Sequence, residues 1–284
     1  MTSSGGARTN GAPSASESMA ESPSDSDGWE VPAFDVVACG PRRHEHALCV
    51  FVLNEGERIR AQLRTMHALQ LPVDVIVADG GSTDGALDPA FLAAHGVRAL
   101  LVKRGPGALS AQMRMGLSWC LTEGYAGIVT IDGNGKDDAS AVPAFVDALR
   151  RGVDHVQGSR YVPGGRGINT PLSRHLGVQL LHAPLISLAA GARYTDTTNG
   201  FRAYSRRFLL DARVRPFRDV FRAYELHYYL AIRAGRLGFS IAELPVTRAY
   251  PADGAVPSKI RGWRGNVNIL RTLWRSVRGA YDPT

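Results

Sequence analysis

The sequence has 284 residues, of which 44% are apolar, so it can build one large domain around a hydrophobic core. Its formal net charge of +7 is unevenly spread: the first 30 residues carry −4 and the remainder carries +11. A basic body indicates an anionic partner, such as a nucleotide, a phosphorylated acceptor or a phospholipid surface. Nucleic acid is the weakest of these candidates, because the sequence has no basic stripe interleaved with aromatic residues.

The N-terminal part of the chain is rich in Ser, Gly, Ala and Pro and shows no periodicity. It predicts a disordered tail and lead-in over residues 1–44. Neither a secretory leader nor an apolar run of about 18 residues is present, so no spanning helix is expected. The cysteines Cys39, Cys49 and Cys120 show no paired spacing, which favours a reduced, cytoplasmic location.

From residue 45 onward, short apolar runs alternate with helical segments, and each run ends in polar residues or glycine. This alternation is typical of an α/β fold with a mainly parallel sheet and helices on both faces. A catalytic domain is expected over residues 45–250. Strands are expected over residues 47–53, 73–78, 97–103, 127–131 and 239–246, and helices over residues 57–69, 108–121, 140–151 and 224–233.

Two segments favour either packing on the domain or contact with a membrane. Residues 176–190 are apolar but too short to span a bilayer, so we expect a helix pair. Residues 251–284 predict a basic amphipathic helix. Its apolar face would carry Trp263, Val267, Leu270, Trp274 and Val277, widened by Ile269 and Leu273, with Arg264, Arg271, Arg275 and Arg278 along its flank.

Polar loops follow the predicted strands, at the sheet edge where ligands of open α/β sheets bind. They begin with Asn54-Glu55, with Asp79 and with Asp132. The glycine-rich phosphate loops of dehydrogenases and P-loop enzymes are absent. Carboxylate and carbonyl oxygens in the loop after residue 131 could hold a hard divalent cation, which could in turn hold a diphosphate. The alternative is an ordinary polar turn.

Taken together and in order, these loops resemble the inverting glycosyltransferase family 2, in particular dolichol- or polyprenol-phosphate mannosyl- and glucosyltransferases. The resemblance covers roughly residues 45–262 and implies the glycosyltransferase-A fold, a nucleotide diphosphate sugar as donor, and Mg²⁺ or Mn²⁺ at the diphosphate. The matching motifs are Asn54-Glu55, DGGSTDG (79–85), the Asp132 loop, GSRYVPGG (158–165), DTTNGFRAYSRR (196–207), ELPV (243–246) and Ser258-Lys259-Ile260.

The resemblance assigns the donor-binding residues. Glu55 and Asp79 would contact the nucleoside, although an acid after a strand also commonly caps the next helix. Asn54, Ser82 and Asp84 belong to the same donor-binding loops, and Ser82 and Asp84 would shape their loop and start the following helix.

The metal-binding motif departs from the family pattern. Asp132 matches its first acid, but Asn134 stands where the second acid is expected, and Lys136 replaces a Gln. Asn is a neutral and weaker oxygen ligand. Lys136 would either repel a cation or itself neutralise the diphosphate, and Asp137 and Asp138 could restore the lost charge.

The resemblance also implies the residues that face the acceptor. Arg160 and Lys259 match positions that face phosphates, where fixed cations stabilise a leaving diphosphate, and Arg174 and Arg202 are weaker candidates. Asp196 matches an acid near the acceptor, where it would act as general base for a hydroxyl acceptor. A phosphate acceptor is already an anion and needs no base, and the sequence leaves this choice open.

The predicted function is therefore sugar transfer, with inversion, from a GDP- or UDP-linked sugar to a polyprenyl phosphate, by a cytoplasmic enzyme peripheral to an anionic membrane surface. One alternative keeps the fold and uses a soluble small molecule or glycan as acceptor. Another is an inactive nucleotide-sugar-binding protein whose metal site is lost at Asn134 and Lys136.

Overall fold

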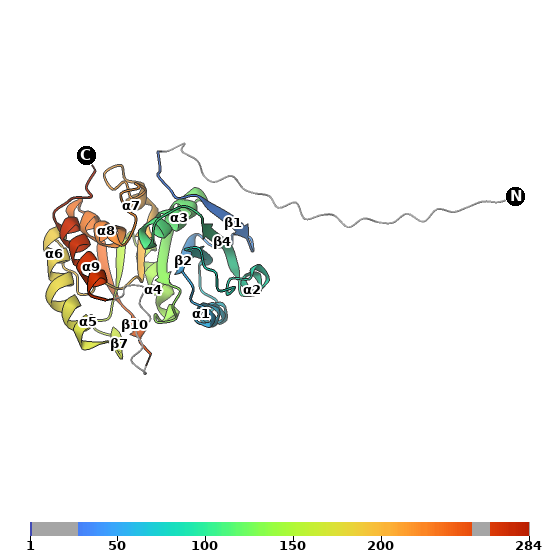
Figure 1. The fold of residues 1–284 in the computed structure, drawn as a ribbon, viewed down its shortest axis with the longest axis horizontal. Helices are drawn as coiled ribbons and strands as arrows, with labels where there is room; N and C mark the ends of the chain where they lie inside the picture. Colours follow the sequence, from blue (N-terminus) through green and yellow to red (C-terminus); the bar gives the residue numbers. More distant parts are fainter. Residues whose placement is uncertain (2–27, 252–261, 284) are drawn as a thin grey trace.

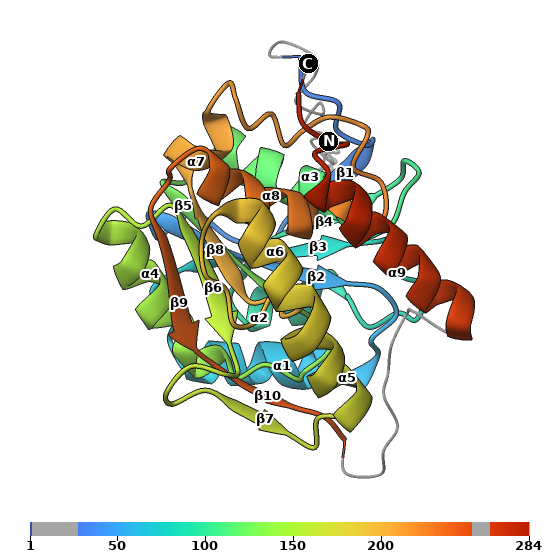
Figure 2. The same cartoon turned by 90° about the vertical axis from the view of Figure 1, so that its left-hand side faces the viewer.

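The computed structural model describes residue 1, residues 28–251 and residues 262–283. These residues form an eight-stranded sheet with helices on both faces, and a separate two-stranded sheet (Figures 1 and 2). The strands are β1 (Phe34–Ala38), β2 (His46–Val52), β3 (Asp74–Asp79), β4 (Val97–Lys103), β5 (Gly127–Asp132), β6 (His155–Ser159), β7 (Arg166–Ile168), β8 (Arg202–Ser205), β9 (Ile241–Pro245) and β10 (Thr247–Ala249).

Helices connect most of the strands. They are α1 (Glu57–Ala68), α2 (Pro89–Ala94), α3 (Leu109–Thr122), the 3₁₀-helix η1 (Ala139–Ala141), α4 (Val142–Arg150), α5 (Leu172–Gly177), the π-helix η2 (Val178–His182), α6 (Ala183–Ala190), α7 (Arg206–Leu210), α8 (Glu225–Arg236) and α9 (Gly262–Val277).

The strands of the large sheet lie in the order β1-β4-β3-β2-β5-β8-β6-β9. Strands β4, β3, β2 and β5 are mutually parallel, and β6 is parallel to β9. Strand β8 runs antiparallel between β5 and β6, and β1 is antiparallel to β4 at the edge. The predicted α/β fold with a mainly parallel sheet and helices on both faces is confirmed.

Strand β2 shows how the sequence builds two cores. All seven of its residues are buried, and alternate side chains point to opposite faces of the sheet. Ala47, Cys49 and Phe51 pack in the core beneath α3 and α8. Leu48, Val50 and Val52 pack in the core beneath α1 and α4. A strand covered on both sides must be apolar throughout, which is why this run could be recognised from the sequence.

The ordered structure begins earlier than the expected domain start at residue 45. Strand β1 pairs with β4 along five residues, and Trp29 lies against Phe217 at a ring-centroid distance of 4.4 Å. Only Phe34 of this strand is buried, because an edge strand has a solvated side, so the segment lacks a long apolar run. Most of the residues expected to form the disordered tail lie outside the part of the chain that the structure describes.

Helices α6, α8 and α9 form a separate packed group beside the sheet (Figure 2). A Cβ atom at Gly235 of α8 would lie 2.2 Å from the carbonyl oxygen of Ala190, so only glycine permits this close packing against α6. Leu273 anchors α9 to the group and is 1% exposed. The predicted amphipathic helix therefore forms and packs on its own domain, although Trp274 on its outer side remains 54% exposed.

Candidate active site

A cavity of about 580 Å³ lies at the carboxyl ends of the parallel strands β2, β3, β4 and β5. Its opposite wall comes from α5, η2, α8 and α9, and from Arg248 on β10. Among the predicted site residues, those that line the cavity are Glu55, Asp132, Asn134, Lys136, Arg174 and Arg202. The fold thus brings together predicted site residues that lie far apart in the chain, from Glu55 to Arg202.

The two loops at one end of the cavity hold each other in place. Ser82 Oγ accepts a hydrogen bond from the backbone N–H of Asn54 (2.8 Å), whose side-chain oxygen accepts one from Thr83 N–H (2.8 Å). Asp84 accepts from the backbone N–H of Gly56 (2.8 Å). Asn54, Ser82 and Asp84 therefore shape the loops, and the helix that follows begins later, with Asp88 as its N-cap.

Asp79 is 3% exposed and turns its carboxylate onto its own loop. It accepts hydrogen bonds from the backbone N–H groups of Gly81 (3.1 Å) and Ser82 (2.9 Å) and from Ser82 Oγ (2.5 Å). Asp79 therefore stabilises its own loop, whereas the next helix is capped by Asp88. Glu55 lines the cavity and is paired with Arg58 at 2.7 Å.

The Asp132 loop forms the middle of the cavity. Gly200 approaches Asp132 so closely that a Cβ atom at that position would lie 2.8 Å from Oδ1 of Asp132. Asn134 turns its side-chain amide toward Asp132, with Nδ2 3.5 Å from Oδ2. Lys136 is 7% exposed, and its ammonium lies 5.4 Å from the ring centroid of Tyr250. The predicted diphosphate site thus holds a carboxylate, an amide and a buried cation.

Arg248 joins this loop from β10 and was not predicted as a site residue. Its Nη2 lies 3.0 Å from Oδ2 of Asp132, and its Nη1 bonds Oδ2 of Asp137. Burial alone would raise the pKa of Asp132, but Arg248 lowers it below its ordinary value. Burial raises the pKa of Asp137. The guanidinium therefore keeps Asp132 ionised at the centre of the cavity.

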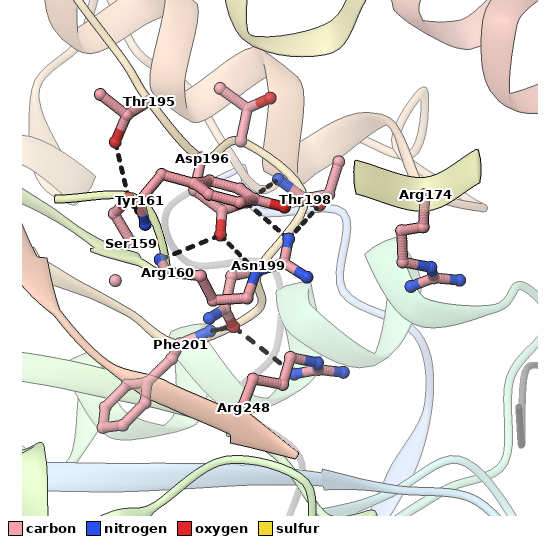
Figure 3. A network of polar contacts seen from close by, with 12 residues as sticks. Ser159, Arg160, Tyr161, Arg174, Thr195, Asp196, Thr198, Asn199, Phe201 and Arg248 are labelled. Atoms are coloured by element: carbon pink, nitrogen blue, oxygen red, sulfur yellow. Dashed lines mark hydrogen bonds and ion pairs between the residues drawn. The ribbon is translucent and has the colours of Figure 1, made fainter. Parts of the chain in front are cut away.

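Arg160 and Asp196 form a buried pair behind the cavity wall (Figure 3). Nε of Arg160 is 2.7 Å from one carboxylate oxygen and Nη2 is 3.0 Å from the other. Nη2 also donates to Thr198 Oγ1 at 3.0 Å, and Thr198 lines the cavity. The two predicted catalytic residues hold each other, and neither side chain is open to solvent.

The loop that carries Asp196 is fixed by the ELPV motif. Glu243 on β9 accepts hydrogen bonds from the backbone N–H groups of Thr195 (2.8 Å) and Asp196 (3.2 Å). Burial raises the pKa of Glu243, and these hydrogen bonds oppose the shift. Glu243 therefore positions the loop and lies away from the cavity lining.

Arg174 lines the cationic end of the cavity, and Tyr250 supports it from outside the cavity lining. Nη1 of Arg174 donates to the Tyr250 hydroxyl at 3.2 Å. Burial would raise the pKa of Tyr250, but Arg248, Arg174 and Arg160 together lower it below its ordinary value. In Figure 3, Arg248 is joined to Asn199, whereas Arg174 stands apart on α5. Positive potential is thus concentrated at one end of the cavity.

Arg202 lies at the cavity base but is 1% exposed and fully occupied. It donates to the carbonyl oxygens of Thr197 (2.7 Å), Asn199 (3.0 Å) and His227 (2.6 Å). It therefore joins two carbonyl groups of the loop before β8 to one carbonyl group of α8. His227 also lines the cavity, and burial, aided by Arg202, lowers its pKa to about 3, so its imidazole is neutral.

Exposed leucines continue from the cavity mouth along α5, η2 and α6. Leu172 is 71% exposed, Leu180 is 73% exposed and Leu188 is 81% exposed. Leu181 and Leu270 line the cavity itself, which connects this surface to α9. We call the following exposed residues the leucine surface: Leu172, Leu176, Leu180, Leu181, Leu188, Val267, Leu270 and Trp274.

Within the described part of the chain, no helix has the length and apolar character needed to cross a bilayer.

The oxygen ligands at the Asp132 loop suit a Mg²⁺ or Mn²⁺ that keeps several waters and takes further oxygens from a substrate diphosphate. Asp132 and Asn134 can each offer one oxygen. Among residues 28–251 and 262–283, no group of three or more His, Cys, Asp or Glu side chains could hold a metal by itself. A cation here would therefore depend on the substrate for part of its ligand shell. Lys259 lies outside the described residues.

The missed residues Arg248 and Tyr250 follow the ELPV motif within a few positions, and that proximity was the available signal. His227 had no motif around it.

Comparison with known proteins agrees with the predicted fold and motifs. Residues 47–212 match the family model described as glycosyl transferase family 2. Polyprenol monophosphomannose synthase of Mycolicibacterium smegmatis is 32% identical over 232 residues, which cover 81% of this chain and 86% of that protein. Undecaprenyl-phosphate mannosyltransferase of Micrococcus luteus is 30% identical over 196 residues, 68% of this chain and 79% of that protein.

Solved structures share the fold at lower identity. Glucosyl-3-phosphoglycerate synthase from Mycobacterium tuberculosis, in complex with UDP, superposes with a TM-score of 0.55 at 18% identity, covering 84% of this chain and 81% of that one. The same enzyme with Mn²⁺, UDP and glucosyl-3-phosphoglycerate gives a TM-score of 0.55 at 19% identity, with the same coverage of both chains.

Proposed function

Since the chain belongs to glycosyl transferase family 2 and is a glycosyltransferase, we propose that it transfers one sugar, with inversion, from a nucleotide diphosphate sugar to a polyprenyl phosphate at the cytoplasmic face of a membrane. The observation that carries this proposal is that Arg174 lines the same cavity as Leu181 and Leu270 of the leucine surface. A phosphate on a long apolar chain presents these two chemistries side by side.

The donor would lie across the strand ends. Glu55 lines the end of the cavity where the Asn54 and Asp79 loops meet, and it would face the nucleoside. Asp132, Asn134 and Lys136 would face the diphosphate. In this arrangement Asp132 and Asn134 would hold a divalent cation, whose contribution is to neutralise the charge that develops on the leaving nucleoside diphosphate.

Fixed charges of the chain support the same step. Lys136 is buried beside the Asp132 loop, and Arg248 is 5% exposed and lines the cavity. Positive groups held in place in a largely buried site stabilise a leaving diphosphate more than mobile surface cations do, because they need no reorganisation during the reaction. Lys136 and Arg248 would therefore favour breaking of the bond between the anomeric carbon and the diphosphate, because they stabilise the diphosphate as it leaves.

The acceptor would approach from the opposite side, past Arg174. An in-line displacement with inversion requires the attacking oxygen to lie across the anomeric carbon from the leaving diphosphate. A phosphomonoester is already an anion and needs no general base. The pairing of Asp196 with Arg160 supports this choice, because a buried carboxylate that is held in two charge-assisted hydrogen bonds is a poor proton acceptor.

The leucine surface would contact the membrane. Arginine side chains accompany it, with Arg271 and Arg275 on α9 and Arg278 directly after the helix. Apolar side chains in the acyl region and basic side chains among anionic headgroups are the combination found in interfacial helices. The same contact would deliver the acceptor phosphate to Arg174.

The test is a transfer assay on purified full-length protein. GDP- and UDP-linked sugars are offered with undecaprenyl phosphate in anionic vesicles, in parallel with a soluble phosphomonoester such as 3-phosphoglycerate. Transfer to the lipid supports the proposal. Transfer only to the soluble acceptor would replace it with the soluble-acceptor alternative. Donor binding without transfer to any acceptor would support a binding protein.

A further inference from the structure

We propose that Arg248 competes with a divalent cation for the carboxylate of Asp132, so that Arg248 sets how tightly the protein holds its metal. The inference rests on the proposed function only in taking Asp132 as the point where a cation binds. It is carried by three observations: the position of Arg248, the charge balance around it, and an unpaired oxygen on Asp137.

Arg248 occupies the side of Asp132 that carries Oδ2. Its Nη2 lies 3.0 Å from that oxygen, and it reaches Asp132 across 116 positions of the sequence. The side chain is 6% exposed and lines the cavity. Because Mg²⁺ lies only about 2.1 Å from an oxygen ligand, it and a guanidinium cannot use the same oxygen from the same direction. Arg248 must therefore leave Oδ2 before that oxygen can serve a cation.

Among the described residues, and leaving aside the exposed Asp138, the charged side chains that meet at this loop are balanced. Asp132 and Asp137 contribute two negative charges, and Arg248 and Lys136 contribute two positive ones. A site for a dication normally has an excess of negative ligands, because their charge offsets the loss of the ion's hydration. Here the excess is absent until a substrate diphosphate arrives. Arg248 and Lys136 thus lower the affinity of the free protein for a cation.

Asp137 provides a place for Arg248 when it leaves Asp132. Nη1 of Arg248 already bonds Oδ2 of Asp137, while Oδ1 of Asp137 is buried and has no hydrogen-bond partner. A small rotation of the guanidinium would let both of its Nη groups bond Asp137, which is the bidentate geometry that Arg and carboxylate groups favour. When Arg248 moves fully onto Asp137, both of these charges remain paired, and Oδ1 of Asp137 gains a hydrogen-bond partner.

The experiment measures Mn²⁺ binding to the free protein by electron paramagnetic resonance, without any sugar donor. Arg248→Gln should bind Mn²⁺ at least about tenfold more tightly than the wild type, the change expected for removing one nearby charge and one competing partner. The matched control is Arg174→Gln, which removes one charge from the same cavity without touching Asp132. It should change the affinity less than about threefold.

An equal gain in Mn²⁺ affinity in the two variants would show a general charge effect and would overturn the proposed competition between Arg248 and the cation. Unchanged or weaker Mn²⁺ binding in Arg248→Gln would overturn it as well. That variant leaves Asp137 buried without its partner and could unfold. The double variant Asp137→Asn/Arg248→Gln is neutral at both positions, and it should also bind Mn²⁺ more tightly than the wild type. Because the measurement uses no acceptor, its outcome is independent of whether polyprenyl phosphate is glycosylated.

Discussion

Arg160 and Asp196 meet in a bidentate ion pair, with nitrogen–oxygen distances of 2.7 and 3.0 Å, and both side chains are almost fully buried. The pair joins the end of β6 to the loop before β8 and places Thr198 in the cavity wall. It gives both residues a structural role, because they hold the loop that places Thr198 in the cavity wall. It also makes a prediction about stability that a catalytic base would not make.

Asp196→Ala should lower the free energy of unfolding by about 3–5 kcal/mol, because it leaves the Arg160 guanidinium buried without its partner. Urea denaturation followed by circular dichroism measures this loss. The matched control is Asp147→Ala, which removes the exposed partner of Arg150 and should cost no more than about 1 kcal/mol. The double variant Arg160→Met/Asp196→Leu should recover most of the loss. A single-variant effect as small as that of the control would contradict the structural role.

Asp132→Ala should abolish sugar transfer, because it removes the carboxylate at the centre of the diphosphate site and leaves Arg248 facing the cavity with one partner fewer. The expected loss in kcat is at least about 100-fold. Asp138→Asn is the matched control from the same loop. Asp138 is exposed and caps η1, which Asn can also do, so its activity should stay near that of the wild type. Retained transfer in Asp132→Ala would refute the assignment.

Arg174→Ala should raise the KM for the lipid acceptor by about 10- to 100-fold, the effect of losing one charge-assisted hydrogen bond to a phosphate. The KM for the sugar donor should change little. Tyr250→Phe removes the hydroxyl that accepts from Arg174 and should give a smaller shift in the same direction. Initial rates measured against each substrate in turn separate the two constants. A change confined to the donor KM would place Arg174 at the diphosphate instead.

Leu180→Asp combined with Trp274→Asp should reduce binding to vesicles that contain anionic lipid, as measured by flotation. The two substitutions put charges on the leucine surface, where side chains are 73% and 54% exposed in the wild type. Leu210→Asp is the control, because Leu210 is also exposed but lies on α7, outside the leucine surface. Equal flotation of all three proteins would rule out this surface as the membrane contact.

Protein stability should fall as the pH is lowered below about 6.5, the ordinary pKa of histidine. Burial lowers the pKa of His155 well below that value, so the unfolded chain binds a proton that the folded chain excludes. Stability from this group is complete above about pH 6.5 and declines by up to about 1.4 kcal/mol per pH unit below it. His155→Phe, which suits a site surrounded by Tyr194, Tyr204 and Phe208, should reduce the slope of unfolding free energy against pH between 5 and 6. An unchanged slope would contradict the assignment.

The parallel half of the sheet could be predicted because its strands are buried on both sides and must be apolar throughout. Strand β8 could not be recognised in this way. It contains Arg202, whose guanidinium is buried and bonds the carbonyl oxygens of Thr197, Asn199 and His227. A charged residue in an interior strand breaks the apolar pattern, and its compensation is visible only in three dimensions.

Much of the site could be predicted because its loops follow the strands directly. The roles within those loops were harder to separate. Asp79 and Glu55 look equivalent in the sequence, yet Asp79 bonds its own loop while Glu55 lines the cavity. The pairing of Arg248 with Asp132 depends on how β10 lies beside the Asp132 loop. An isolated bridge between Asp137 and Arg248 fixes that position, and no local pattern encodes it.

The contact between Asp132 and Arg248 also bears on the order of folding. Strands β2, β3 and β4 follow one another within residues 46–103 and can pair early, whereas this contact joins residues 116 positions apart. Closing so long a loop has an entropic cost that early pairing does not repay. In a refolding chain the sheet should therefore appear before the cavity is complete. Nucleotide binding would then report the last stage of assembly, after the far-ultraviolet signal of the helices has been recovered.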